Sequence, residues 1–126
     1  MRILVVEDEP LTRALFAKEL ASDGYSVVQA ANATEAIDII SAGDRFDLVL
    51  TDVIMPGLFD GFELAEFVKD VAPRTKVIVV SGYDRANGAR TDIDLFIDKP
   101  TTAHHLRREV ARALGLDRLI DQTGAS

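Results

Sequence analysis

The sequence predicts a single α/β domain in which helices cover both faces of a five-stranded parallel sheet. Short apolar runs rich in Val and Ile alternate along the chain with segments whose apolar residues recur at helical spacing. Such an alternation is typical of a parallel sheet between two layers of helices. The 126 residues fit one domain, and a hydrophobic content of 48% is sufficient for one core.

Five apolar runs are the predicted strands. Three of them are almost continuously apolar, as expected for parallel strands that are buried on both faces. The strands are expected at residues 3–6, 25–28, 46–50, 76–80 and 95–97. Because crossovers between parallel strands are right-handed, few topologies remain, and we expect the flavodoxin-like, doubly wound strand order 2-1-3-4-5.

Four helical patterns lie between or after these strands. Pro10 begins the first and Gly24 ends it, Asn32 with Glu35 resembles a capping box at the start of the second, and Gly115 ends the fourth. The core-facing residues are expected to be Leu11, Leu15, Phe16 and Leu20 in the first, Ala36, Ile37 and Ile40 in the second, Leu64, Ala65, Val68 and Val71 in the third, and Leu106, Val110, Ala113 and Leu114 in the fourth.

The segment between the fourth and fifth predicted strands lacks an apolar helical stripe. It contains two glycines and several polar turn formers. We therefore expect a mobile loop with at most one helical turn over residues 84–93, in place of the helix that belongs there. Residues 117–126 are expected to form a short C-terminal extension that frays at its end, which leaves residues 1–116 as the domain.

Composition excludes several classes of function. A formal net charge of −7 argues against a generic nucleic-acid surface, and the absence of cysteine excludes disulfides and thiol chemistry. No apolar stretch approaches the roughly 20 residues of a membrane span, and the apolar run at residues 1–6 is too short for a signal peptide. We therefore expect a cytoplasmic protein.

Polar side chains follow four of the predicted strands at their carboxyl ends. Glu7 and Asp8 follow the first strand, Asp52 the third, Ser81 the fourth and Lys99 the fifth. In open α/β sheets, ligands bind beyond this edge. We expect the five side chains to converge there, although they span most of the sequence.

The chemistry of this set favours phosphoryl transfer. Three crowded carboxylates repel one another unless a cation is present, and an all-oxygen site suits Mg²⁺. A carboxylate can itself become an aspartyl phosphate. Phosphoryl transfer requires that charge on the moving oxygens be neutralised, which Mg²⁺, Lys99 and the Ser81 hydroxyl would provide.

Four motifs resemble the receiver domain of bacterial two-component response regulators. They are VVEDEP at 5–10, LVLTDVIMPG at 48–57, VVSGY at 79–83 and FIDKP at 96–100. Each alone is a weak match, but all four occur in the family's order and at the expected strand ends. The resemblance extends from Met1 to about Leu116.

The resemblance implies a role for each site residue. Asp52 would be phosphorylated, Asp8 would bind Mg²⁺ directly and Glu7 through water. The backbone carbonyl of Ile54 would be a further metal contact. Lys99 would pair with the Asp52 carboxylate and then with the phosphoryl group.

The resemblance also implies a switch. Ser81 would move to bind the phosphate, and the aromatic ring of Phe96 would follow it. The Lys99–Pro100 bond is usually cis in this family. The SGY sequence and the short segment after it resemble a receiver subgroup with a reduced fourth helix. We expect phosphorylation to order residues 82–93, and Tyr83 to limit water access to the phosphate.

A signalling switch rather than an enzyme is therefore expected. The implied phosphodonor is a histidine kinase or a histidine phosphotransfer protein, and the target is an unknown protein, with no nucleic-acid or membrane partner. We expect a monomer before phosphorylation. Met1 and the residues after Leu116 favour a stand-alone protein, although a receiver cut from a hybrid kinase would have the same sequence.

Other functions fit the residues less well. A phosphatase of the haloacid dehalogenase type needs an acid two residues after its nucleophile, where Ile54 stands here. A flavin carrier of the same fold needs a phosphate-binding first loop, whereas EDEPLTR is acidic and lacks glycine. The set of Asp8, Asp52, Ser81 and Lys99 argues against a receiver-like module that is never phosphorylated.

Some site residues also have simpler interpretations. Asp8 could cap the helix that begins at Pro10, and Asp52 could cap the turn that follows it. His104 and His105 could be phosphohistidines, but we expect them to form the solvated first turn of the last helix.

Overall fold

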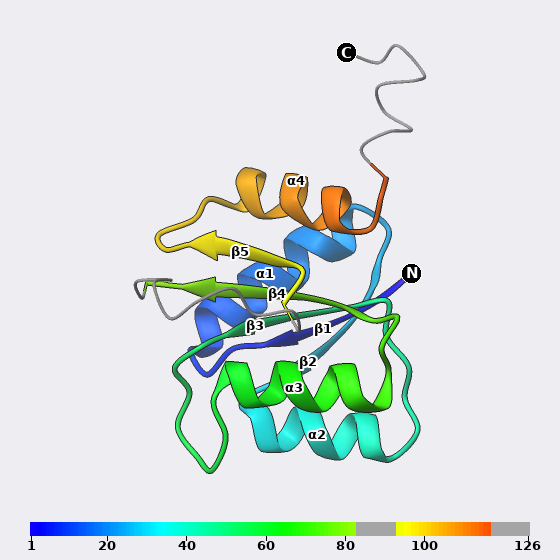
Figure 1. The fold of residues 1–126 in the computed structure, drawn as a ribbon. Coiled ribbons are helices and arrows are strands. Elements are labelled where there is room, and N and C mark those ends of the chain that lie inside the picture. Colours follow the sequence, from blue (N-terminus) through cyan, green and yellow to red (C-terminus); the bar gives the residue numbers. More distant parts are fainter. Residues whose placement is uncertain (83–92, 117–126) are drawn as a thin grey trace.

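The computed structural model describes residues 1–82 and 93–116 and contains one five-stranded parallel sheet (Figure 1). The strands are β1 (Arg2–Val6), β2 (Ser26–Ala30), β3 (Leu48–Asp52), β4 (Lys76–Ser81) and β5 (Leu95–Asp98). Their order in the sheet is β2-β1-β3-β4-β5, and every neighbouring pair is parallel. The predicted fold class and strand order are confirmed.

Helices form a layer on each face of the sheet. They are α1 (Pro10–Ser22), α2 (Ala33–Ser41), α3 (Gly61–Val71) and α4 (Ala103–Ala113). Figure 1 shows α1 and α4 on one face, and α2 and α3 on the other. None of the helices in the described part of the chain has the length and apolar character needed to cross a membrane.

The four helices within the described residues are consistent with a reduced fourth helix between β4 and β5. Most of the loop predicted at 84–93 lies outside the described residues, as does the extension at 117–126. Ile93 is an exception, because it is buried in the core cluster between the sheet and the α2–α3 layer.

Each helix begins at a side chain that accepts a hydrogen bond from the first turn. The caps are Glu9, Asn32, Asp60 and Thr102. In α3 the exchange is reciprocal: Asp60 accepts from the Glu63 amide at 2.8 Å, and Glu63 accepts from the Asp60 amide at 3.0 Å. The predicted position of Asn32 at the start of α2 is thereby confirmed.

The predicted apolar face of α1 is partly wrong. Phe16 and Leu20 are buried, but Leu11 is 81% exposed and Leu15 is 48% exposed. At about 100° per residue, Leu11 and Leu15 lie about 180° and 140° around the helix from Leu20, so one face cannot contain all three. Val71 at the end of α3 is also exposed, at 53%.

The strand register brings the carboxyl ends of the strands to one edge. Val6 pairs with Thr51, and Asp52 pairs with Val80 one position further along. Ser81, the last residue of β4, pairs with Asp98, the last residue of β5. The residues at or just after these ends are therefore neighbours in space.

Candidate functional site

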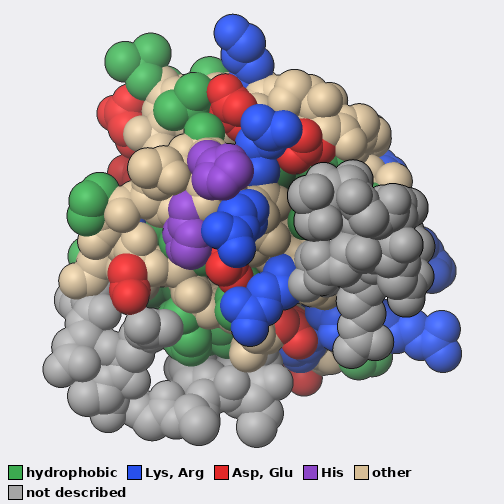
Figure 2. Space-filling view, turned by 90° about the horizontal axis from the view of Figure 1, so that it is seen from above, with side chains coloured by type: hydrophobic (Ala, Val, Ile, Leu, Met, Phe, Trp, Pro, Cys, Tyr) green, Lys and Arg blue, Asp and Glu red, His purple; other side chains and the backbone are tan. Residues whose placement is uncertain are grey.

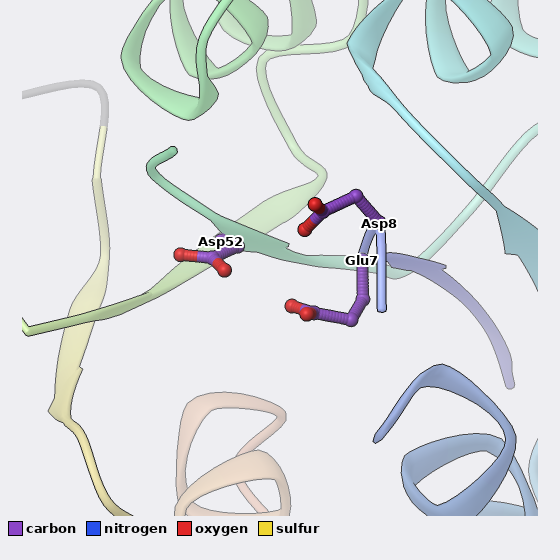
Figure 3. Close-up of side chains that lie close together, drawn as sticks. All are labelled: Glu7, Asp8 and Asp52. Carbon is purple, nitrogen blue, oxygen red and sulfur yellow. The ribbon is translucent and has the colours of Figure 1, made fainter. Parts of the chain in front are cut away.

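Three carboxylates meet at this edge of the sheet. Glu7 and Asp8 directly follow β1, and Asp52 ends β3. One oxygen from each lies within 4.8 Å of the others, and Figure 3 shows the side chains of Glu7 and Asp8 extending toward Asp52. Glu7 and Asp52 are buried, whereas Asp8 is exposed. An all-carboxylate set that is open to solvent on one side fits Mg²⁺, which keeps several waters.

The start of α1 sets the direction of these acidic side chains. Glu9, and not Asp8, caps the helix by accepting from the Leu11 amide at 2.8 Å. The interpretation of Asp8 as a helix cap is therefore wrong, and its carboxylate joins the cluster instead. The Arg13 guanidinium donates to the backbone carbonyl of Glu7 at 2.8 Å, which ties the loop to the first turn of α1.

Lys99 brings a positive charge to Asp52. Its Nζ donates to Asp52 Oδ2 at 2.6 Å, and the Val53 amide donates to Oδ1 at 2.7 Å. Partial burial lowers the pKa of Lys99, but the hydrogen bond and the charge of Asp52 outweigh it and raise that pKa above its ordinary value. The ammonium group thus stays charged beside the carboxylate.

Burial and a neighbouring charge act together on Glu7. Burial, followed by the charge of Asp52, raises the pKa of Glu7 from 4.5 to about 7, although the charge of Lys99 opposes this. The charge of Lys99 does not offset the combined effect of burial and of Asp52 on the pKa of Glu7. A divalent cation would relieve the remaining repulsion, as the sequence predicts.

Gly61 is a site residue that the sequence analysis did not single out. A Cβ atom at this position would lie 2.0 Å from the backbone carbonyl oxygen of Asp52, which no side chain permits. The Gly61 amide also donates to the Val53 carbonyl at 2.9 Å. The signal in the sequence was a glycine directly after the Asp60 cap, where its flexibility is otherwise unfavourable to a helix.

The remaining predicted site residues lie at or near the same edge. Ser81 is buried at the end of β4, and its carbonyl accepts from the Lys99 amide at 3.0 Å. The Lys99–Pro100 bond is cis, as expected. Ile54 follows two residues after Asp52, with its side chain exposed to solvent. Tyr83 lies outside the described residues.

Phe96 lies on β5, three residues before Lys99. It is half-buried and packs against Phe62 of α3, with ring centroids 6.5 Å apart. His104 and His105 are both exposed in the first turn of α4, as expected of a solvated turn. Figure 2 shows the two histidines on the surface beside Lys and Arg side chains.

The family of the chain follows from a comparison with family models. The model described as "Response regulator receiver domain" matches residues 3–111. The chain belongs to this family. Receiver domains are signalling domains that bind Mg²⁺ at an acidic pocket and interact with histidine kinases or phosphotransfer proteins, and the cluster of Glu7, Asp8 and Asp52 fits a phosphoacceptor aspartate with Mg²⁺. The phosphatase and the receiver-like module that is never phosphorylated are not favoured.

Curated relatives of this receiver domain are longer proteins. A cyclic di-GMP phosphodiesterase of Thermotoga maritima is 31% identical over 118 residues, which cover 90% of this chain and 31% of the relative. The transcriptional regulatory protein TcrA of Mycobacterium tuberculosis is 36% identical over 104 residues, covering 79% of this chain and 40% of the relative. The chain thus spans well under half the length of both.

Solved receiver structures are similar over nearly their whole length. The response regulator TrrA of Thermotoga maritima, in complex with Mg²⁺ and BeF, has 32% identity and a TM-score of 0.79, covering 89% of this chain and 97% of TrrA. The receiver domain of the hybrid histidine kinase CckA has 35% identity and a TM-score of 0.76, and the match covers 90% of this chain and 99% of the CckA receiver.

Gly61→Ala is expected to lower the free energy of unfolding by about 1–3 kcal/mol, because the added methyl group overlaps the Asp52 carbonyl. Alanine otherwise favours helices over glycine, so a loss of stability would isolate this overlap. Urea denaturation measures the effect. Gly82→Ala is the matched control, since a Cβ there would meet only Lys99 Cβ at an ordinary 3.9 Å. Equal stability of the two variants would contradict the prediction.

Glu7→Gln is expected to stabilise the Mg²⁺-free receiver by about 1–2 kcal/mol at pH 8 and by little at pH 4.5. Because the folded state binds a proton that the unfolded chain releases, the wild type loses this stability as the pH rises from 4.5 to about 7. Glutamine does not titrate and loses nothing over this range.

Urea denaturation in EDTA at the two pH values measures this difference. The exposed Asp38→Asn is the control and should show no comparable change with pH. Added Mg²⁺ should stabilise the wild type more than Glu7→Gln. A Glu7→Gln effect of the same size at both pH values would rule out a raised pKa for Glu7.

Proposed function

We propose that Asp52 accepts a phosphoryl group and that partner proteins recognise the resulting change. One observation carries the proposal: Asp52 lies among carboxylate oxygens within 4.8 Å and holds the Lys99 ammonium at 2.6 Å. The nucleophile, the acidic ligands and the neutralising lysine of an aspartyl phosphorylation site are therefore present together.

The proposed reaction transfers the phosphoryl group from a phosphohistidine to an oxygen of Asp52. A new O–P bond forms and the N–P bond breaks, and the imidazole nitrogen leaves with the bonding electron pair. Lys99 stabilises the negative charge of the transferred oxygens and remains paired with the phosphoryl group. When bound, Mg²⁺ supplies further neutralisation. Asp8 and Asp52 would hold it directly, Glu7 through water, and Ile54 through its backbone carbonyl.

The proposed switch uses Ser81 and Phe96. Ser81 is at the same edge as Asp52, since β4 extends one residue past the position that pairs with Asp52. Its hydroxyl would bind a phosphoryl oxygen, and Phe96 would follow. The ordering of residues 82–93 and the role of Tyr83 remain predictions. If beryllofluoride leaves the hydrogen exchange of residues 82–93 unchanged, the predicted ordering is contradicted. If Tyr83→Ala leaves the lifetime of the phosphoryl group unchanged, the predicted role of Tyr83 is contradicted.

We further propose that residues 1–116 act as a binding module with no reaction beyond their own phosphorylation and dephosphorylation. The phosphodonor is a histidine kinase or phosphotransfer protein, and the phosphorylated domain binds a protein target. A monomer before phosphorylation and a cytoplasmic location remain predictions. Sedimentation of the unphosphorylated protein as a dimer would disprove the monomer.

Exposed apolar side chains on α1 and in the loop after Asp52 support docking of a protein phosphodonor at the acidic site. Leu11 and Leu15 lie on the exposed face of α1, which begins two residues after Asp8. Ile54 and Leu58 are 60% and 82% exposed in the loop that follows Asp52. A phosphodonor must bring its histidine to Asp52, so its surface would cover these residues.

Leu15→Ser is expected to slow phosphorylation by a protein donor severalfold and to leave phosphorylation by acetyl phosphate unchanged. The small donor reaches Asp52 without covering α1, whereas a protein donor loses apolar contact area. Val71→Ser is the matched control, because Val71 is similarly exposed but lies at the end of α3. Similar slowing by both substitutions, or slowing with acetyl phosphate, would argue against this docking surface.

Incubation with Mg²⁺ and acetyl phosphate is expected to add one phosphoryl group, measured by intact mass. The adduct should be absent in EDTA and in Asp52→Asn, because the first removes the cation and the second the nucleophile. Asp44→Asn, at an exposed aspartate near the opposite edge of the sheet, should be phosphorylated like the wild type.

One outcome of the acetyl phosphate experiment would contradict the proposed switch. A protein that binds Mg²⁺ but takes up neither a phosphoryl group nor beryllofluoride would not be a phosphorylation switch. A protein that binds beryllofluoride without retaining a phosphoryl group would be a switch with rapid hydrolysis.

A further inference from the structure

Two elements that are distant in the sequence hold Asp52 in place. Lys99 follows β5 and donates to Asp52 Oδ2 at 2.6 Å. Gly61 begins α3, and its backbone packs so closely on the Asp52 carbonyl that no Cβ atom fits between them. The geometry of the Lys99–Asp52 pair therefore depends on how β5 and α3 lie relative to each other.

An aromatic pair joins β5 to α3. Phe62 is the residue after Gly61, and its ring centroid lies 6.5 Å from that of Phe96, with the ring planes inclined by 59°. Inclined rings at this separation attract each other beyond the effect of their buried area. Both side chains are half-buried and pack against the apolar cluster between the sheet and the α2–α3 layer.

β5 has contacts on both faces: Ile97 packs in the cluster that contains Leu106 and Val110 of α4, and Phe96 packs on the α3 side. It has four residues and lies at the edge of the sheet, where β4 is its only hydrogen-bonded neighbour among the described strands. Phe96 lies in β5 and Lys99 is the first residue after that strand, so a displacement of Phe96 would pass to Lys99 along the strand. The contacts of Asp52, Gly61, Phe62, Phe96 and Lys99 thus form a closed ring.

We propose that Phe62 is a positioning residue for phosphoryl transfer to Asp52. Its ring holds Phe96, and through β5 it holds the Lys99 ammonium against the carboxylate. The kinetic part of this inference rests on the proposed function. Because a displacement of about 1 Å can slow a reaction 100-fold, we expect Phe62→Leu to slow phosphorylation by acetyl phosphate on the order of tenfold.

A matched pair of variants separates positioning from loss of core packing. Phe46→Leu removes the same atoms from the same apolar cluster, two residues before the start of β3, whereas Asp52 is the last residue of that strand. We expect Phe62→Leu to slow phosphorylation and Phe46→Leu to leave the rate within about twofold of the wild type. Phe62→Tyr retains the ring and should restore the rate. Equal slowing by both leucine variants would overturn the inference.

A double-mutant cycle tests whether Phe62 acts through Lys99. Lys99→Ala removes the group that the ring positions, so Phe62→Leu should slow phosphorylation little further in that background. The Ser81→Ala background should retain the full effect of Phe62→Leu. Slowing by Phe62→Leu that is undiminished in Lys99→Ala would overturn the inference, since the ring would then act on something else.

A crystal structure of Phe62→Leu tests whether Phe62 positions Lys99, and it requires no phosphodonor. The distance from Lys99 Nζ to Asp52 Oδ2 should be longer than 2.6 Å in Phe62→Leu and unchanged in Phe46→Leu. If the wild type took up no phosphoryl group, the proposed function would fail, whereas this distance would still support or overturn the positioning role. An unchanged distance in Phe62→Leu would overturn it.

Discussion

Repulsion among the carboxylates of Glu7, Asp8 and Asp52 is the constraint on which this structure depends. Buried carboxylates are unfavourable unless hydrogen bonds or opposite charges stabilise them. Here the Val53 amide and Lys99 stabilise Asp52, and the Arg13 guanidinium holds the backbone that carries Glu7. Burial and the charge of Asp52 together raise the pKa of Glu7. A cation bound to the cluster would relieve the repulsion that remains.

The same arrangement explains how a small chemical change can reach distant residues. Asp52 contacts one element through its side chain, since Lys99 follows β5, and another through its backbone, since Gly61 begins α3. The Phe62–Phe96 pair connects these two elements directly. A new charge on Asp52 would therefore act on both Lys99 and Gly61. Because the residues between them are close-packed, a displacement of one would be transmitted to the other.

Much of the fold and site could be predicted from the sequence because the relevant signals are local. Apolar runs define strands, and a polar residue at the end of a run marks both the strand end and the site. Asp52 and Lys99 were found in this way, and the structure brings them within 2.6 Å of each other. The sequence also shows which residues can cap a helix, as it did for Asn32.

The errors and omissions come from packing, which a local pattern does not contain. Leu11 and Leu15 lie on one side of α1 and Leu20 on another, and only the position of the sheet decides which side is buried. The need for glycine at position 61 comes from the Asp52 carbonyl that packs against it, and the local sequence does not show this contact. The contact between Phe62 and Phe96 joins residues far apart in the sequence, and nothing in either local sequence indicates its partner.

The short edge strand β5 has a consequence for solubility. An exposed edge can recruit the strands of other molecules and so start aggregation, and proteins protect such edges with short strands, charges and proline. β5 has four residues and ends at Asp98, and Lys99 and Pro100 follow it directly. Pro100 has no amide hydrogen to donate, and the two charged residues disfavour an apolar neighbour. Residues beside the candidate site therefore also help to keep sheets of separate molecules from joining.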